Sequence, residues 1–198
     1  MCAENIFVDE LSIEPCHKTM TMTFQKGLNY LKGQNGSGKT MLLDYVAGIR
    51  NDQKQRISGN ENIVYINQNI FFADRLTGTD FVKFVYRLGN KSREREKFFE
   101  FTERFDIDKK VDVKTLMEKQ WGLLSGGERK YLYSMVLLSL DREWYILDEP
   151  FAYLDTEKKE ILWKVIEAFA SEGKGVILTS HEEDSRINGS DIHVINLD

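Results

Sequence analysis

Residues 33–40 read GQNGSGKT, and this stretch decides what kind of fold the chain can adopt. It follows the apolar segment LNYL at 28–31 and runs into TMLLDYVAGI at 40–49, so we expect a strand, a glycine loop and a helix in that order. Glycine lets successive backbone N–H groups turn toward one anion, where a Cβ would obstruct the approach. The candidate binding residues are those of the whole loop: Gly33, Gln34, Asn35, Gly36, Ser37, Gly38, Lys39 and Thr40.

The composition bounds the class of protein. With 198 residues, 41% of them hydrophobic, the chain can build one sizeable core. Its formal net charge of −5 lacks the basic excess that nucleic acid attracts, so no nucleic-acid partner is expected. The longest apolar runs, such as WYIL at 144–147, fall far short of the roughly 18 residues that a membrane span needs. The N-terminus lacks a signal-peptide pattern, and Cys2 and Cys16 have neither zinc nor disulfide spacing. We therefore expect a cytoplasmic protein with reduced thiols.

Strand and helix patterns alternate along most of the chain. TMTMTF at 19–24 alternates threonine with apolar residues, as a half-buried strand does. Further patterns predict strands at 62–67, 143–149, 175–180 and 191–197, and helices at 125–140 and from 156 onward. Such alternation is typical of an α/β fold with a mostly parallel sheet.

The segment from about 76 to 125 differs, because its patterns are helical throughout. Phe81, Phe84, Val85 and Leu88 recur at i, i+3, i+4 and i+7, which predicts an amphipathic helix over 78–88. In 91–120, nine Lys and Arg nearly balance eight Asp and Glu, which favours solvated helix faces. We interpret the segment as a small helical insertion.

The loop at 33–40 matches GxxxxGK[ST], the P-loop pattern of proteins that bind nucleoside triphosphates. Lys39 is then placed to reach the β- and γ-phosphates, and the Thr40 hydroxyl to ligate Mg²⁺. WYILDEP at 144–150 puts Asp148 and Glu149 at the carboxyl end of an apolar strand, the edge at which open α/β sheets bind ligands. There one carboxylate can hold Mg²⁺ and the next can polarise an attacking water.

A second helix start carries similar chemistry. Residues 124–128, LSGGE, open a helix whose first turn offers N–H groups and the Ser125 hydroxyl to an anion. Two such helix ends in one small chain need either two ligands or two chains that share them.

Taken together and in this order, the motifs resemble those of the nucleotide-binding subunits of ATP-binding cassette (ABC) transporters, over almost the whole chain. GQNGSGKT resembles Walker A, LSGGE the signature motif, and WYILDEP Walker B with Glu149 as its catalytic glutamate. AYLD at 152–155 resembles the D-loop and LTSHE the segment of the switch histidine, here His181. Gln68 follows a predicted strand and precedes the helical insertion, as the Q-loop glutamine does.

The resemblance implies ATP and Mg²⁺ as ligands and a head-to-tail pair of cassettes, in which ATP at one P-loop meets the signature of a second copy or homologous partner. It assigns catalysis to Glu149, His181 and Lys39. It assigns Mg²⁺ binding to Thr40, Gln68 and Asp148. It assigns contacts across the pair to residues of the signature and the D-loop, namely Ser125, Gly126, Gly127, Glu128 and Asp155.

The resemblance also implies a fold and a partner. The expected fold is a P-loop NTPase core with a mostly parallel sheet, an N-terminal antiparallel β portion and a small helical insertion, here one domain at 1–198 with its helical subdomain at approximately 76–125. The expected function is ATP hydrolysis that powers a transporter, by docking onto separate integral membrane subunits at the cytoplasmic face. The groove beside Gln68 and the insertion helices, with Phe71, Phe72 and Phe81, is the expected docking surface, and the alternative for each of these aromatic residues is a place in the core of the helical lobe.

Two positions depart from the family pattern. Many members carry a second hydroxyl directly after the P-loop threonine, where this chain has Met41. The stretch IEPCHK at 13–18, where the family usually supplies an aromatic residue for the adenine, has no Phe, Tyr or Trp, so His17 is the candidate there.

Two other functions stay open at this point. One is a soluble ABC-type ATPase that acts on a non-membrane partner. The other is a phosphotransferase of the P-loop kinase class, which would need an acceptor site and leaves LSGGE unexplained.

Overall fold

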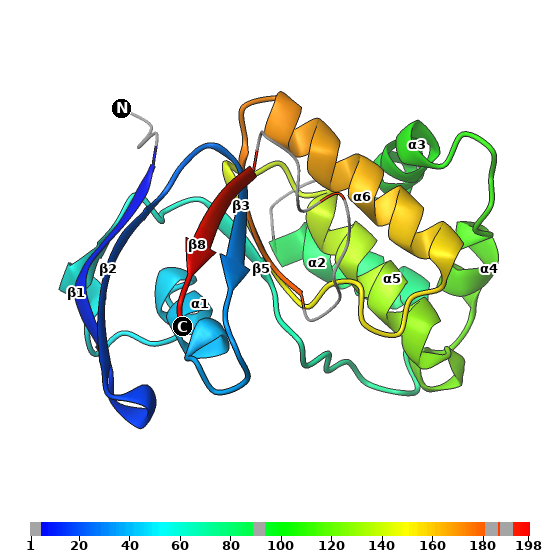
Figure 1. Ribbon diagram of the computed structural model, residues 1–198. Coiled ribbons are helices and arrows are strands. Elements are labelled where there is room, and N and C mark those ends of the chain that lie inside the picture. The colour runs from blue at the N-terminus through cyan, green and yellow to red at the C-terminus, as the bar shows by residue number, and fades with distance from the viewer. Residues whose placement is uncertain (1–4, 89–93, 181–185, 187–191) are drawn as a thin grey trace. The chain divides into compact units, whose positions relative to one another are not determined.

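The computed structural model describes residues 5–88, 94–180, 186 and 192–198. The chain forms two compact units. The first comprises Met1–Asn67, Arg142–Pro150 and Ile166–Asp198, and the second comprises Gln68–Asp141 and Phe151–Val165. Figure 1 shows the elements of both.

A five-stranded parallel sheet is the centre of the first unit. Its strands are β3 (Gly27–Lys32), β5 (Ile63–Ile66), β6 (Trp144–Asp148), β7 (Gly175–Thr179) and β8 (Ile192–Asn196), in the order β5-β6-β7-β3-β8. Each neighbouring pair is parallel, so the prediction of a mostly parallel sheet is confirmed. Every residue of β6 and β7 is buried, because strands inside a parallel sheet are covered on both faces. Apolar side chains therefore fill these strands up to their carboxyl ends.

A smaller antiparallel sheet at the N-terminus completes the β structure of this unit. It contains β1 (Ile6–Ile13), β2 (Lys18–Phe24) and β4 (Ile57–Ser58) in the order β2-β1-β4. Short 3-10 helices at Glu14–Cys16 and Lys54–Arg56 precede β2 and β4. The predicted N-terminal antiparallel portion is thus confirmed.

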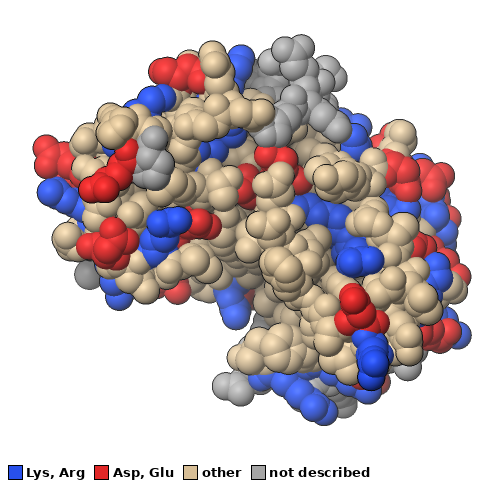
Figure 2. Space-filling model, turned by 90° about the horizontal axis from the view of Figure 1, so that it is seen from below, with Lys and Arg blue, Asp and Glu red and all other residues tan. Residues whose placement is uncertain are grey.

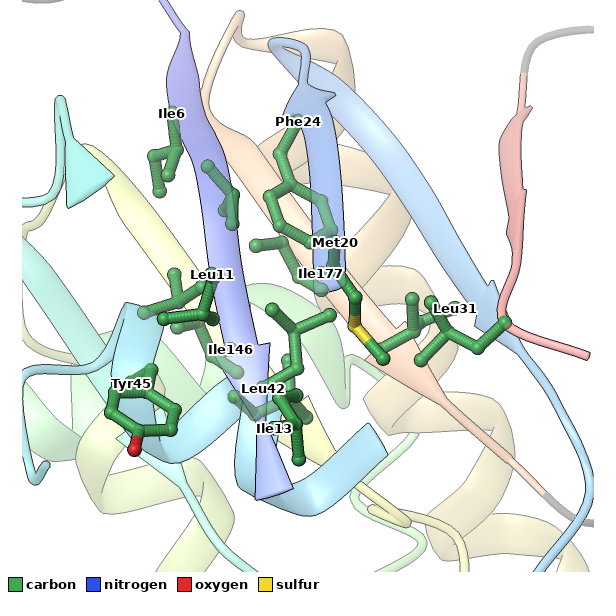
Figure 3. Packing of buried hydrophobic residues seen from close by; sticks show 14 of the residues in the cluster. Ile6, Leu11, Ile13, Met20, Phe24, Leu31, Leu42, Tyr45, Ile146 and Ile177 are labelled. Atoms are coloured by element: carbon green, nitrogen blue, oxygen red, sulfur yellow. The ribbon is translucent and has the colours of Figure 1, made fainter. Parts of the chain in front are cut away.

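Helix α1 (Lys39–Val46) packs in the core of the first unit. Figure 3 shows side chains of β1 and β2 meeting those of α1 and of strands of the larger sheet. Leu11, Leu42, Ile146 and Ile177 are fully buried in this cluster. The burial of such side chains stabilises the fold by about 1.5–3 kcal/mol each. Because α1 is anchored in this way, the loop before it starts from a fixed position.

The second unit is helical. It contains α2 (Gly78–Leu88), α3 (Glu94–Phe105), α4 (Val113–Glu118), a 3-10 helix at Trp121–Leu123, α5 (Gly126–Leu138) and the first part of α6 (Thr156–Ser171). Asp112 caps α4 by accepting the N–H of Thr115 at 3.0 Å. The unit contains the predicted insertion and extends beyond it over α5 and the start of α6.

Helix α2 has the predicted bounds, but its buried face is not the predicted one. Phe81 and Val85 are buried, whereas Phe84 is 52% exposed and Leu88 is 72% exposed. Val82 and Tyr86 take the inner positions instead. Successive residues of a helix are rotated by about 100°, so the predicted face and the observed one overlap at Phe81 and Val85. Packing against the rest of the unit determines which of the two faces is buried.

Of the two interpretations of Phe81, the structure supports a place in the core of the helical unit and contradicts an accessible docking surface. Its ring lies 4.9 Å from that of Trp121 and 5.6 Å from that of Tyr133, inside the unit. Phe72 is half-buried against Phe81, at 5.0 Å between ring centroids. Phe71 is 87% exposed and is the accessible member of the three.

Within the described parts of the chain, no helix has the length and apolar character required to cross a membrane. On the face shown in Figure 2, acidic and basic groups are scattered among uncharged residues. This mixed pattern agrees with the small net charge of the sequence.

Candidate nucleotide and magnesium site

The glycine loop between β3 and α1 has the conformation that its sequence demands. Gly36 has φ 83° and Gly38 has φ 97°, a left-handed region that residues with a Cβ rarely adopt. No described side chain caps the first turn of α1, so its N–H groups are available to a ligand. A Cβ on Gly33 would lie 2.5 Å from the Ser37 Oγ, an atom that is buried and has no hydrogen-bond partner among the described residues. The loop is therefore a cradle of donors.

Lys39 is held in the same loop. Its side chain is almost wholly buried, and its Nζ donates to the carbonyl oxygens of Gly33 at 2.5 Å and Gln34 at 3.0 Å. An ammonium group has three donors and is strongly attracted to phosphate oxygens. The positive charge of Lys39 thus lies within the loop that would bind an anion.

Thr40 connects the loop to the end of β6. Its hydroxyl donates to Asp148 Oδ2 at 2.8 Å, although the two residues are 108 positions apart. Asp148 is 1% exposed and ends β6. Hydroxyl and carboxylate oxygens are hard ligands of the kind that Mg²⁺ prefers. The sequence prediction that Thr40 and Asp148 share one site is in accord with this distance.

Glu149 directly follows Asp148, at the carboxyl end of β6. It lines a hollow of about 320 Å³ together with glycine-loop residues and Met41. Its backbone is in the left-handed region, with φ 51°, and its N–H donates to the Thr179 hydroxyl at 2.9 Å. Glu149 thus lines the same hollow as Lys39 and Thr40.

The donors and acceptors of this hollow fit a nucleoside triphosphate with Mg²⁺. Backbone N–H groups of the loop, the buried Ser37 hydroxyl and the Lys39 ammonium match phosphate oxygens. The Thr40 and Asp148 oxygens match a hard divalent cation.

The signature segment lies in the second unit, where it begins α5. Ser125 caps the helix by accepting the Glu128 N–H at 3.1 Å, and Glu128 accepts the Ser125 N–H at 2.7 Å. This is a capping box. The Lys119 ammonium donates to Glu128 Oε1 at 2.8 Å and, together with the Ser125 N–H, lowers the pKa of the Glu128 carboxyl. The predicted contact of Glu128 with ATP stays a prediction, since its carboxylate closes its own helix start.

The second glycine of the signature has a close neighbour. A Cβ on Gly127 would lie 2.5 Å from the carbonyl oxygen of Tyr153. Gly126, by contrast, has open space around the corresponding position. Tyr153 is itself in the left-handed region, with φ 67°, and its side chain is 86% exposed. The signature and the D-loop therefore pack backbone to backbone.

Asp155 begins α6. Its Oδ1 accepts the Lys158 N–H at 3.0 Å, as an N-cap does, and its Oδ2 pairs with the Lys158 ammonium. The Lys158 side chain is the main reason why the pKa of Asp155 is lowered. Gln68 is exposed in the second unit. His181 lies outside the described residues, so its predicted role is not tested.

The structure shows what surrounds Met41 and the 13–18 stretch, where the sequence departs from the family pattern. Met41 is half-buried and packs against the hydrophobic cluster of the first unit. The Sγ of Cys16 lies 3.0 Å from the position of a Cβ on Gly38, so the 13–18 stretch does adjoin the glycine loop. His17 is exposed, with φ 48°, and its N–H donates to the Glu14 carbonyl. Its contact with a base stays a prediction.

Thr179 is a residue of this site for which the sequence indicated no role, although it lies within LTSHE at 178–182. It ends β7 and is fully buried, and its hydroxyl donates to Asp148 Oδ1 at 2.6 Å. A polar residue at the end of an apolar strand was the available signal. Its meaning depended on which strand lies next to β6, and the sequence does not state that.

Comparison with known proteins agrees with this geometry. The sequence model described as ABC transporter matches residues 17–152. The cytochrome c biogenesis ATP-binding export protein of Haemophilus influenzae is 27% identical over 193 residues, covering 91% of this chain and 87% of that protein. The energy-coupling factor transporter ATP-binding protein of Thermotoga maritima is 31% identical over 178 residues, covering 83% and 66%.

Solved structures share the fold. An ABC transporter ATP-binding protein from Pyrococcus furiosus superposes with a TM-score of 0.77 at 24% identity, covering 98% of this chain and 97% of that one. A dimeric bacterial ABC transporter cassette superposes with a TM-score of 0.76 at 14% identity, covering 97% and 94%. These likenesses show the fold. The family model, which matches residues 17–152 of the 198, shows that the chain belongs to the ABC transporter family of ATP-binding proteins, whose members are ATPases.

Proposed function

We propose that this chain hydrolyses ATP with Mg²⁺ at the P-loop site and thereby powers a membrane transporter. The observation that carries the proposal is the hydrogen bond of 2.8 Å between Thr40 and Asp148, beside a glycine loop that stores the charge of Lys39. This pair supplies two oxygen ligands at the place where the loop would hold the phosphates.

Each residue has a part in the proposed reaction. Lys39 releases the carbonyls of Gly33 and Gln34 and binds phosphate oxygens instead. Thr40 and Asp148 hold Mg²⁺, which when bound neutralises charge on the phosphates. Glu149 orients the attacking water and accepts its proton. Gln68 and His181 are proposed as a further metal contact and a γ-phosphate contact.

The test of the reaction is Glu149→Gln. In the presence of ATP and Mg²⁺ we expect hydrolysis to fall by at least about 100-fold, since a positioned general base contributes 10²–10⁴-fold. Nucleotide should remain bound, because the glycine loop and Lys39 are unchanged. Glu96→Gln, on the exposed surface of α3, is the matched control and should hydrolyse like the unmodified chain. A Glu149→Gln chain that hydrolyses ATP at the unmodified rate would refute the assignment.

We propose that the active form is a head-to-tail pair, and that the two units of the chain act as one ATP-binding domain over 1–198. Ser125 and Gly126 are exposed at the start of α5, where a phosphate of an ATP bound to another copy could meet the N-terminal end of the helix. A cassette of the same fold was solved as a dimer, which supports the proposal. Light scattering of Glu149→Gln with ATP and Mg²⁺ should give a dimer, and a monomer under these conditions would contradict it.

We further propose that separate integral membrane subunits receive the second unit, which places the chain at the cytoplasmic face of the membrane. Phe71 is 87% exposed, and aromatic residues are enriched in protein–protein interfaces, so Phe71 is the residue that we propose for the contact. Two related proteins named above are ATP-binding proteins of transporters. The partner would take its apolar contact from Phe71 rather than from buried Phe81.

The test of the partner is affinity purification from detergent-solubilised membranes. We expect an integral membrane protein to accompany the unmodified chain, and Phe71→Ser to reduce its recovery. Ile107→Ser removes a side chain that is 79% exposed in the same unit, and it should leave recovery unchanged. Recovery of soluble proteins alone would favour a soluble ABC-type ATPase instead.

A further inference from the structure

One hydroxyl group holds both carboxylate residues of the site. Thr179 Oγ1 donates to Asp148 Oδ1 at 2.6 Å and accepts the Glu149 N–H at 2.9 Å. Asp148 and Thr179 are also paired in register across the parallel strands β6 and β7. Thr179 lies within LTSHE at 178–182, but the resemblance assigns a role there only to His181.

The proton of this hydroxyl has one available destination. An ionised carboxylate only accepts hydrogen bonds, and a backbone N–H only donates. The Thr179 hydroxyl must therefore give its proton to Asp148 and use a lone pair for Glu149. Thr179 is fully buried, so water does not compete for either bond. Its β-branched side chain has few χ1 rotamers, which keeps the hydroxyl in place.

The two bonds act on different parts of the site. The bond to Oδ1 fixes the rotation of the Asp148 carboxyl, so that Oδ2 faces the Thr40 hydroxyl at 2.8 Å. The bond from the Glu149 N–H holds a backbone with φ 51°, a conformation that costs energy for a residue with a Cβ. That backbone sets where the Glu149 side chain starts.

We propose that Thr179 is the positioning residue of the site: its hydroxyl aligns Asp148 for Mg²⁺ and holds the backbone of Glu149 for its work as the base. The proposal rests on the proposed function. It assigns Thr179 no contact with the nucleotide. Its removal should therefore weaken the response to Mg²⁺ and the rate of hydrolysis, while the binding of nucleotide without metal stays unchanged.

The experiment compares Thr179→Val, Thr179→Ser and the unmodified full-length chain. The first readout is binding of a fluorescent ATP analogue with Mg²⁺ and with EDTA, which does not depend on turnover. For Thr179→Val we expect the apparent affinity for Mg²⁺ to fall roughly tenfold, as a buried carboxylate loses one donor. Binding in EDTA should change less than about twofold, because the glycine loop and Lys39 keep their contacts.

The second readout is steady-state hydrolysis. For Thr179→Val we expect kcat to fall at least about tenfold while KM for ATP changes little, since the loss concerns alignment rather than nucleotide binding. Thr179→Ser keeps the hydroxyl and should recover most of both losses. Thr102→Val is the control for burying a methyl in place of a hydroxyl: Thr102 is 3% exposed in α3, its hydroxyl donates to the Phe99 carbonyl, and neither readout should move.

Three results would overturn the proposal. They are an unchanged Mg²⁺ response and kcat in Thr179→Val, an equal loss in the Val and Ser variants, or a loss of metal-free nucleotide binding. If Thr179→Val fails to fold, Thr179→Cys replaces it, because the cysteine S–H is only a weak donor. Thr179→Cys should then show the losses expected of Thr179→Val, and Thr179→Ser should again recover most of them. Absence of Mg²⁺-dependent hydrolysis in the unmodified chain would instead reject the proposed function.

Discussion

Gly127→Ala tests the packing of the signature segment against the D-loop. The new Cβ would lie 2.5 Å from the Tyr153 carbonyl oxygen, and real Cβ atoms essentially never come within 3.0 Å. The carbonyl must therefore retreat by at least about half an ångström. It belongs to a residue whose φ of 67° is already in the left-handed region, so the backbone has few alternatives.

The expected cost follows from two opposing terms. Overpacking of this kind destabilises a protein by about 1–3 kcal/mol. Alanine in a helix interior is better than glycine by about 0.8–1.0 kcal/mol, and this gain is smaller in the first turn. The net effect should be a loss of about 0.5–2 kcal/mol, which lowers the melting temperature by roughly 2–4 °C per kcal/mol in a protein of this size.

Gly126→Ala is the matched control, because a Cβ at Gly126 has no atom within 4 Å among those placed in the structure. It keeps the helix-propensity gain without the clash, so it should be as stable as the unmodified chain or slightly more stable. Thermal unfolding followed by far-ultraviolet circular dichroism distinguishes the two variants. Equal melting temperatures for Gly126→Ala and Gly127→Ala would show that the close approach to Tyr153 does not constrain this position.

Two further predictions concern the helix starts of the second unit. Glu128→Gln should make the free energy of unfolding depend less on pH in acid. The pKa of Glu128 is lowered on folding, so the carboxylate contributes about 1 kcal/mol of stability above its unfolded-state pKa. This contribution disappears as the pH falls through the pKa of the folded state. Urea unfolding between pH 6 and about 3 checks this, with parallel curves for both chains as the contrary result. Asp155→Ala should lower the free energy of unfolding at pH 7 by about 1 kcal/mol through loss of the cap on α6, whereas Asp155→Asn should keep most of it. Equal urea midpoints for the Ala and Asn variants would contradict the cap.

The local parts of the fold followed from the sequence because their causes are local. A strand, a glycine loop and a helix were expected around 33–40, and β3 and α1 lie there. The Ser125 and Asp155 caps also arise from residues within three positions of each other. The bounds of α2 were read correctly for the same reason.

The parts that failed depended on tertiary contacts. The pattern placed Phe84 and Leu88 on the inner face of α2, but both are exposed, because the packing of Phe81 against Trp121 and Tyr133 turns the helix differently. Phe81 lies on the predicted apolar stripe of α2 and is 4% exposed, whereas Phe71 precedes that helix and is 87% exposed, so the docking prediction failed for the residue that the helical pattern already placed inside. Periodicity identifies a helix more reliably than the face that it buries.

The strand order explains why the LTSHE motif did not indicate a role for Thr179. In the order β5-β6-β7-β3-β8, strand β7 lies between the strand that ends at Asp148 and the strand that leads into the glycine loop. The end of β7 is therefore the position from which one side chain can reach Asp148 and the Glu149 backbone within the sheet. A large or apolar residue there would leave a buried carboxylate oxygen without its donor, at a cost of about 1–3 kcal/mol. The requirement for a small hydroxyl arises from a neighbour 31 residues away in the sequence, so a local pattern could not express it.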